Sequence, residues 1–483
     1  MKKILVLALL ALAPMTLNAT PTRLLAIDNM NQIVPDDWDA TTYYSLSPNF
    51  KNHWYADSYA SGKSFAWAFL DIKIGTLVVW YNKDFEGGPV YDAAAAVSSI
   101  GITESPFGTD VVNAWEPREY RIKAPDTKLG LGYAMEVLDN LNLGLCFRLA
   151  RQNNTKDIDF RDGNGNGTSL GSSTAYQSTL GYPVLGVANV GNRQNDNALL
   201  LSPQFSYNGE SFTLDAKFDM FWPGIDNAHT ESLISGSSTG SVTQTLKDKN
   251  RMNWAAKPKL RYMFSPNSSL MLRGSYGKLD LSADHRVTGA FSGPAFNAFQ
   301  AAGYDFTDAS QDTGIDVWDA FLGVVNSWGK GKGLVTWGIG VTGQTLKLAG
   351  TTFQTAATAA SYNDVVKNVV TNLTDNKLTV PVVIGTELSL TPWCKARGSV
   401  QRNFFTATST NTVAENYNNS GVLTSRKTTD VSSDFLKEWA FNTGFGLNFG
   451  QFSWDTALNT TFLASSNAAF TNPLFQSSFT YEF

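Results

Sequence analysis

The chain carries little charge. Asp, Glu, Lys and Arg make up 16 % of it, against about 25 % in typical soluble domains. The formal net charge is −5, which argues against a nucleic-acid-binding protein. Histidine is scarce, with 3 residues, and none stands in the sequence context of a zinc site or a hydrolytic nucleophile. We therefore expect no enzymatic activity and no cofactor.

Cysteine is nearly absent. The 2 residues, Cys146 and Cys394, lie far apart in the chain, each within a predicted strand. A disulfide between them is one interpretation, and a pair of isolated small apolar residues is the other, which we favour.

Long hydrophobic runs are missing after the N-terminus. Residues 1–19, MKKILVLALLALAPMTLNA, combine a basic start at Lys2 and Lys3, an apolar stretch and a small residue, Ala19. This pattern predicts a cleaved secretory signal peptide. No run of about 18 apolar residues follows it, so the sequence predicts no transmembrane helix.

Strand-like alternation is what the sequence has in abundance, and the last stretch, NPLFQSSFTYEF, shows it clearly. Its aromatic residues share one side of an extended strand, opposite Gln476, Ser478, Thr480 and Glu482. Those aromatic residues are Phe475, Phe479, Tyr481 and Phe483. The stretch resembles the C-terminal strand of Gram-negative outer-membrane β-barrel proteins. The resemblance implies that this strand closes the barrel and carries the signal read by the barrel-assembly machinery.

Short turns and long polar segments alternate along the chain. The predicted strand pairs are 65–73 with 77–82, 129–137 with 141–150, 198–207 with 212–222, 254–264 with 270–278, 315–326 with 334–346, 377–390 with 394–405 and 437–449 with 452–463. Turns such as Asn208-Gly209 have hairpin chemistry. The segments between pairs, 83–125, 151–197, 223–253, 283–314, 349–376 and 406–434, are predicted to be extracellular loops. Within them, helical spacing of Val and Leu predicts a loop helix over 361–374.

The two faces of the predicted strands differ in polarity. Phe452, Trp454 and Leu458 share one face, opposite Ser453 and Asp455. Tryptophan and phenylalanine gather near strand ends, as in the aromatic girdles of membrane barrels. The sequence therefore predicts an all-β fold, a transmembrane antiparallel up-and-down β-barrel over residues 53–483, with its apolar face toward lipid. Because such barrels usually have an even number of strands, we expect about 16 of them, and about 14 at the fewest, with Trp54–Ala60 supplying the first.

The predicted lumen face carries charges of both signs, with an excess of Lys and Arg. Its candidate pore-lining residues are Lys128, Glu136, Arg148, Asp215, Lys217, Asp219, Lys257, Lys259, Arg261, Arg273, Lys395, Arg397 and Asp455, with Glu387 also on this face. One interpretation is a wall that attracts anions. The alternative is that these charges pair with carboxylates on neighbouring strands or loops.

Two further segments carry hypotheses. The stretch 20–52 faintly resembles the N-terminal segment of porin-like and fatty-acid-transporter-like barrels; it is either tucked into the barrel or a periplasmic leader. A weak calcium candidate lies in 157–167 and has alternating oxygen ligands at Asp157, Asp159, Asp162, Asn164 and Asn166. The bidentate Glu that a calcium loop needs is replaced by Ser173, so we predict no metal site there.

These features lead to three functional hypotheses for a protein of the cell outer membrane. The first is a porin for passive diffusion of small hydrophilic solutes, favouring anions. The second is a transporter of hydrophobic substrates with an N-terminal plug, and the third is a non-conducting surface or adhesion barrel. Expected partners are outer-membrane lipid and lipopolysaccharide, the barrel-assembly machinery and small solutes, and a homotrimer is one expected assembly.

Overall fold

The structure, a computed structural model, describes residues 21–28, 33–34, 39–59, 64–81, 127–159, 186–222, 224, 226–235, 238–249, 251–280, 282–292, 305–329, 332–355, 366–417, 423–435, 438–463 and 471–482. The predicted signal peptide, 1–19, lies outside these residues and stays a prediction. None of the helices in the described ranges is long and apolar enough to cross a membrane.

Almost all of the described chain is β-strand. The strands are β1 His53–Tyr59, β2 Ser64–Asp71, β3 Thr76–Tyr81, β4 Thr127–Leu138, β5 Leu141–Asp159, β6 Gly186–Asn208, β7 Phe212–Trp222, β8 Asp226–Ser235, β9 Ser238–Asp248, β10 Asn253–Ser265, β11 Ser268–Asp280, β12 Ala283–Ser292, β13 Asp305–Trp328, β14 Gly333–Thr355, β15 Val366–Thr391, β16 Cys394–Tyr417, β17 Leu423–Phe435, β18 Glu438–Phe449, β19 Phe452–Leu463 and β20 Thr471–Glu482. The helices, α2 Pro21–Asp28, α3 Asp39–Thr42 and η1 Tyr44–Asn49, all lie at the N-terminal end.

The strands form one antiparallel sheet that closes into a barrel of 16 strands. β20 pairs with β1, with Phe479 opposite Ala56, so the last strand closes the barrel on the first. The predicted architecture and first strand are therefore confirmed. β8, β9, β12 and β17 continue the barrel strands: β6 pairs with β7 and then β8, and β16 pairs with β18 and then β17.

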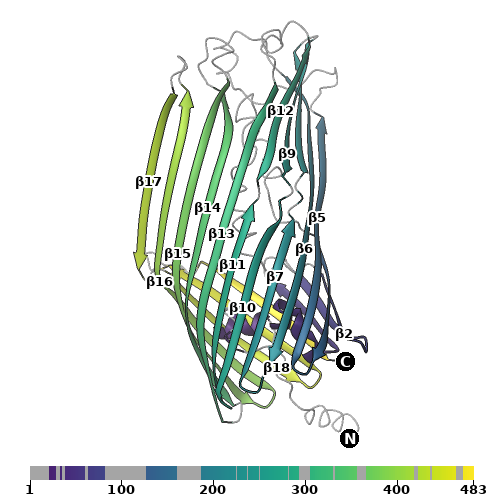
Figure 1. The fold of residues 1–483 in the computed structure, drawn as a ribbon, viewed down its shortest axis with the longest axis vertical. Helices are drawn as coiled ribbons and strands as arrows, with labels where there is room; N and C mark the ends of the chain where they lie inside the picture. Colours follow the sequence, from purple (N-terminus) through teal and green to yellow (C-terminus); the bar gives the residue numbers. More distant parts are fainter. Residues whose placement is uncertain are drawn as a thin grey trace.

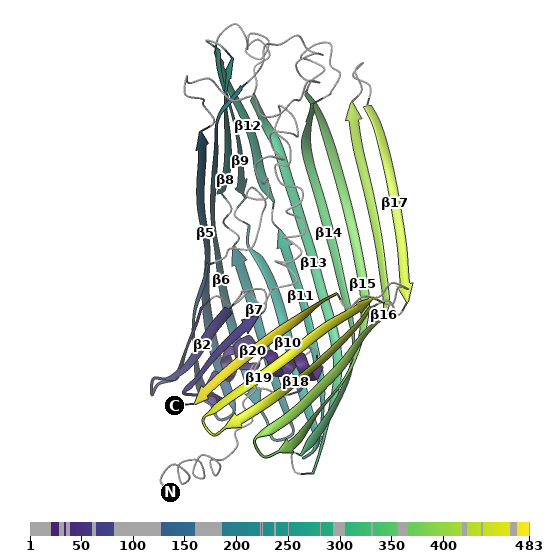
Figure 2. The same cartoon turned by 180° about the vertical axis from the view of Figure 1, so that it is seen from behind.

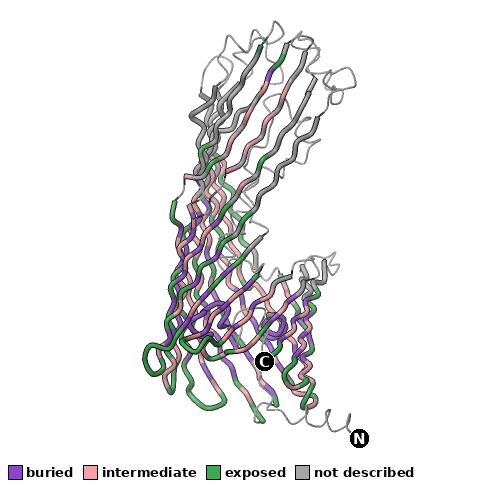
Figure 3. Tube along the Cα trace, turned by 90° about the vertical axis from the view of Figure 1, so that its right-hand side faces the viewer, coloured by how far each residue is buried: buried purple, intermediate pink, exposed green. Residues whose placement is uncertain are grey.

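The wall is tall on one side and short on the other (Figures 1, 2 and 3). β15 has 26 residues, whereas β19 has 12. About 9 to 11 residues suffice to cross a bilayer, so β13 to β16 extend well beyond it. The prediction of loops over 223–253 and 406–434 was wrong, because β8, β9, β16 and β17 occupy most of these segments. Their residues are polar on both faces, so the alternation that marks a transmembrane strand is absent.

The predicted loop helix is also wrong where the structure describes it. Residues 366–374 belong to β15 and pair with β14 from Val366 to Thr374. The helical spacing of Val366, Val369, Val370 and Leu373 did not decide the conformation, since the segment pairs with β14 along its length and with β16 from Val370 onward. Residues 361–365 lie outside the described residues.

The barrel wall is apolar outside and polar inside. Leu131 is 51 % exposed and Phe445 53 %, whereas Asn142 and Asn442 on the opposite face are each 4 % exposed. Outward-facing aromatic residues lie at two heights on the wall. On β13, Trp318 and Trp328 are ten positions apart, which is close to the number of residues in a membrane-crossing strand. A soluble barrel would show the reverse polarity, so the outer surface is one that lipid covers.

Candidate functional site in the barrel lumen

The N-terminal segment lies inside the barrel. We call its described parts, residues 21–28, 33–34 and 39–50, the plug. Residues 22–27, 33–34 and 39–47 of the plug are all buried. In Figures 1 and 2 the plug is the dark purple element enclosed by the lower part of the wall. The plug contacts both halves of the barrel, since α2 packs on β14 to β20 except β17, and η1 packs on β3 to β6.

Glu387 is the centre of the contact between α2 and the wall. Its carboxylate accepts from Arg23 Nε at 3.0 Å, Arg397 Nε at 2.7 Å and Lys395 Nζ at 3.2 Å. Arg397 also pairs with Asp455 on β19. Arg23 and Glu387 are both nearly inaccessible to solvent. Three cations and two carboxylates thus compensate one another inside the barrel, which is the condition for holding charge away from water.

Asp57 holds the N-terminal end of α2 at the barrel seam. Its Oδ2 accepts from Gln476 at 2.9 Å and from Ser478 at 2.5 Å, both on β20. Thr22 Oγ1 donates to the same oxygen at 3.3 Å and also contacts Ser478. The plug is therefore attached where the first and last strands meet.

A second ion pair fixes the middle of the plug to β10. Asp39 lies 2.6 Å from Lys259 Nζ, and both side chains are buried. Arg261, two positions further on the same strand, donates to the Ile33 carbonyl oxygen at 2.9 Å. The Ile33 side chain packs beside Gly323, where an added Cβ would lie 2.7 Å from Ile33 Cγ2. The wall thus has a small residue where the plug approaches it.

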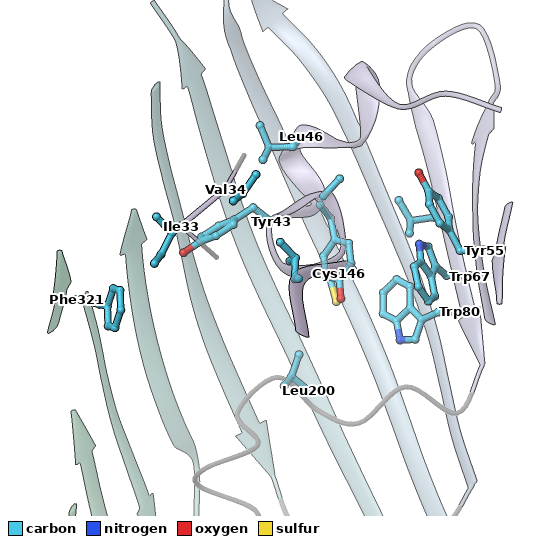
Figure 4. Close-up of a cluster of buried hydrophobic side chains, with 14 of the residues drawn as sticks. Ile33, Val34, Tyr43, Leu46, Tyr55, Trp67, Trp80, Cys146, Leu200 and Phe321 are labelled. Atoms are coloured by element: carbon cyan, nitrogen blue, oxygen red, sulfur yellow. The ribbon is translucent and has the colours of Figure 1, made fainter. Parts of the chain in front are cut away.

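Tyr43 and Leu46 of the plug belong to one buried cluster with Trp80 of the wall (Figure 4). Aromatic stacking holds the last turn of the plug. The Tyr44 and Trp80 rings are parallel, with centroids 4.7 Å apart. The Arg148 guanidinium lies 4.7 Å from the Trp80 ring and 5.3 Å from the Tyr44 ring, a cation–π arrangement. Tyr44 N–H also donates to Gln204 Oε1. The adjacent residue, Ser45, bonds to Ser206 at 2.6 Å.

A row of apolar side chains crosses the wall on the side of the plug away from the short turns. Leu200 on β6 pairs with Phe221 on β7. Leu279 on β11 pairs with Ile315 on β13, which pairs with Leu346 on β14. Asn253 joins the two groups, because it pairs with Phe221 and accepts from the Asp280 backbone N–H beside Leu279. We call Leu200, Phe221, Leu279, Ile315 and Leu346 the apolar belt; all are buried, in one cluster with Ile33 and Tyr43 of the plug.

Most predicted lumen charges contact the plug or each other. Lys217 pairs with Asp219 at 3.4 Å, and Arg273 with Asp319 at 3.4 Å. The buried members of the predicted set are Arg148, Asp215, Lys217, Asp219, Lys259, Arg261, Arg397 and Asp455, while Lys257, Arg273 and Lys395 are half-buried. Glu136 is exposed beside the turn after β4, and the Lys128 side chain is outside the described part. That these residues line a conducting path, or favour anions, stays a prediction.

The other predicted sites lie mostly beyond the described residues. β5 includes the backbone of Asp157 and Asp159, whereas 160–185, with Asp162, Asn164 and Asn166, is not described. Over the described ranges, no cluster of His, Cys, Asp or Glu could hold a metal ion. Phe475 and Tyr481 are exposed on the outer face of β20; their role in assembly stays a prediction. Cys146 and Cys394 are both free thiols.

Sequence reasoning missed the residues that the plug contributes. The sequence predicts no site role for Arg23, Tyr44 or Asp39, although Asp39 belongs to the acidic cluster Asp36, Asp37 and Asp39, nor for Asp57 and Trp80 on the wall. The available indication was the cluster of ionisable residues in a segment without strand alternation. Several of their partners lie hundreds of positions away, Arg23 with Glu387 for example, and one sequence contains no record of such pairs.

No protein-family model matches the sequence, and no curated protein matches it. Among solved structures, the Pseudomonas putida toluene transporter TodX is 10 % identical, with 97 % of this chain and 99 % of that chain covered and a TM-score of 0.38. A Pseudomonas aeruginosa FadL homologue is 11 % identical, with 94 % and 96 % covered and a TM-score of 0.39. The Ralstonia pickettii toluene transporter TbuX is 9 % identical, with 96 % and 98 % covered and a TM-score of 0.36.

Likeness at this level does not identify a substrate. The polarity of the wall, its aromatic levels and its closure by the C-terminal strand identify the kind of protein. The chain is an outer-membrane β-barrel of the Gram-negative type, with its N-terminal segment inside the lumen.

Proposed function

We propose that this protein transports hydrophobic molecules across the outer membrane, with the plug as the gate. The observation that carries the proposal is the position of the plug, which contacts the wall from β3 through β6 and again at β10 and at β14 to β20 except β17. A passive pore for hydrophilic solutes needs an open aqueous lumen. Here the described lumen contains buried helices instead.

The lumen charges support a gate rather than an ion-selective wall. A ring of Lys and Arg selects anions when the cations face water. In this barrel Arg23, Lys395 and Arg397 converge on Glu387, and Lys259 pairs with Asp39. These ion pairs stabilise the plug inside the barrel. The diffusion-porin hypothesis relied mainly on the lumen cations facing water, so it loses its main support.

The apolar belt supplies an apolar lining for a hydrophobic substrate. Its side chains point into the barrel on the side of the plug away from the short turns, and they are buried in this structure. Apolar area that leaves water gains about 25 cal/mol per Å². A hydrophobic molecule would therefore bind to the belt once the groups that cover it move aside. No energy source is required, because the step runs down a concentration gradient.

Uptake into liposomes tests this proposal. Refolded protein is placed in liposomes that hold an enzyme able to report arrival of a small apolar aromatic compound. We expect faster arrival than through protein-free liposomes, and no acceleration of a sugar of similar size. Equal acceleration of the sugar would restore the porin hypothesis, and no acceleration of either would favour the non-conducting barrel.

A further inference from the structure

The strand β17 is an open edge of the sheet. Its 13 residues, Leu423–Phe435, pair with β16 along the whole strand. On the other side of the same column of the wall, the ladder between β18 and β19 ends at Glu438 and Leu463. Among the described strands, β17 therefore has one partner. Its second edge presents backbone N–H and C=O groups over about 40 Å.

This free edge lies above the outer surface of the bilayer. On the lipid-facing side of β18, Trp439 lies ten positions before Phe449, which adjoins a short turn. Trp439 therefore stands at the outer of the two aromatic heights, and β17 continues the wall beyond it. Figure 2 shows β17 beside the low part of the wall that β18, β19 and β20 form. Residues 427–433 are exposed except Thr428, which is half-buried, so both faces of the strand are wet.

A second copy of the same strand fits this edge in one two-fold register. In an antiparallel pair around a two-fold axis, each residue lies opposite the residue equally far from the axis in the other copy. With the axis at Thr428, Arg426 of each copy lies opposite Asp430 of the other. An axis at Lys427 or Asp430 would place like charges directly opposite, which is unfavourable, and an axis at Thr429 would pair no charges. The sequence of β17 therefore favours the Thr428 register, which has two ion pairs.

The antiparallel direction also fixes where the second copy lies. Two copies in one membrane point the same way, so their β17 strands run in the same direction. A two-fold axis perpendicular to the sheet reverses the second barrel, which places it in a facing membrane. Each tall wall then stands over the low part of the other barrel, so the two outlines are complementary (Figures 2 and 3).

We propose that β17 joins copies of this protein on two facing outer membranes by edge-to-edge strand pairing. Backbone hydrogen bonds supply the attachment, and the two ion pairs set the register. One pair of strands is a weak contact, but many copies on each surface add their contacts together. The contact lies outside the lumen, so it does not depend on the proposed transport.

Clustering of liposomes that carry the full-length protein tests this inference. Arg426→Asp and Asp430→Arg each turn both ion pairs into like-charge pairs. We expect either variant alone to cluster at least about tenfold more slowly than the parent. A mixture of the two variants regains both ion pairs and should cluster as the parent does.

The matched control is Lys377→Asp. Lys377 is exposed, and it lies in the same row as Thr408 of β16 and Ser432 of β17. Its strand, β15, has partners on both sides, so the charge reversal should leave clustering unchanged. The SDS-gel mobility of unheated samples shows that each variant is folded before it is placed in liposomes.

Cysteine cross-linking reads the register directly. Thr428→Cys places a thiol on the two-fold axis, within disulfide reach of the same position in the facing copy, so oxidation of clustered liposomes should give linked dimers. Val431→Cys is the control, since this position is 73 % exposed but lies opposite position 425 of the other copy. No clustering of the parent, no clustering of the mixed variants, or equal cross-linking at both positions would overturn the proposal.

Discussion

At the scale of single residues, Glu387 is the main determinant of how the plug is attached to the wall. It accepts from Arg23, and it also holds Lys395 and Arg397. In the described strand pairs, the neighbouring strands β14 and β16 place no second carboxylate opposite Glu387. One buried acid therefore couples the plug to β15 and β16, and through Arg397 to Asp455 on β19.

Replacement of this acid should be strongly destabilising. Glu387→Ala would leave buried cations without their partner, and such a loss costs about 3–5 kcal/mol. We expect the urea midpoint of unfolding, measured by tryptophan fluorescence in detergent, to fall accordingly. Glu136→Ala is the control, because Glu136 is exposed beside a turn and should change stability by less than about 0.5 kcal/mol. Similar midpoints for the two variants would contradict the assigned role of Glu387.

Gly323 should also determine the position of the plug. A side chain there meets Ile33 at 2.7 Å, whereas one at Gly274 on β11 would come no closer than 3.7 Å to its neighbours. We expect Gly323→Val to displace the plug and Gly274→Val to leave it seated. Protease cleavage within the plug measures this, with faster cleavage only in Gly323→Val. Equal cleavage of both variants would show that the Ile33 contact does not determine where the plug lies.

At the scale of elements, the barrel and the plug are held by different forces. The barrel strands are held by a closed ladder of backbone hydrogen bonds, including β1 with β20. The plug is held by side chains such as Asp39 on Lys259 and Tyr44 on Trp80. The ladder does not require the plug, so the two elements are separable.

Deletion of residues 21–50 should therefore leave a folded barrel. We expect the deletion variant to keep its β-sheet circular dichroism and its heat-dependent gel mobility. Its melting temperature should fall, because Glu387, Lys259 and Asp57 lose plug partners and buried charges without partners are destabilising. A variant without β-sheet signal would show instead that the plug is needed to close the barrel.

The sequence predicted the elements better than it predicted the site. Strand alternation located β18 to β20, because lipid on one side and a polar interior on the other impose a period of two. The even strand count of such barrels located β1. Beyond the membrane, β8, β9 and β17 face water on both sides, so no such period exists. The sequence therefore predicts loops where these strands lie. The plug has no period at all. Its contacts, Asp39 with Lys259 for instance, depend on long-range geometry that one sequence does not encode visibly.

At the scale of the whole molecule, the apolar belt and the plug lie in series along the proposed path. A hydrophobic substrate would meet Leu346, Ile315 and Leu279 first, then the cluster that includes Ile33. The same barrel presents lipid-facing residues on its outer surface. The belt and the membrane contact therefore use opposite faces of one sheet.

Loss of apolar character in the belt should slow uptake without opening the pore. Ile315→Thr keeps the branched shape and replaces a methyl-bearing arm with a hydroxyl. We expect uptake of an apolar aromatic compound to fall about tenfold, since a buried aliphatic side chain contributes roughly 1.5–3 kcal/mol of apolar transfer energy. Ile315→Val is the control and should transport nearly as the parent does. Unchanged uptake in Ile315→Thr would remove the belt from the path.

The most direct test of the plugged lumen is single-channel conductance in a planar bilayer, compared between the full-length protein and the variant that lacks residues 21–50. The account predicts no stable open steps from the full-length protein and large, steady steps from the deletion variant. A salt gradient across the bilayer then reads the ion preference of the emptied lumen. Large steady steps of equal size from both proteins would contradict the account, because the plug would then not close the barrel.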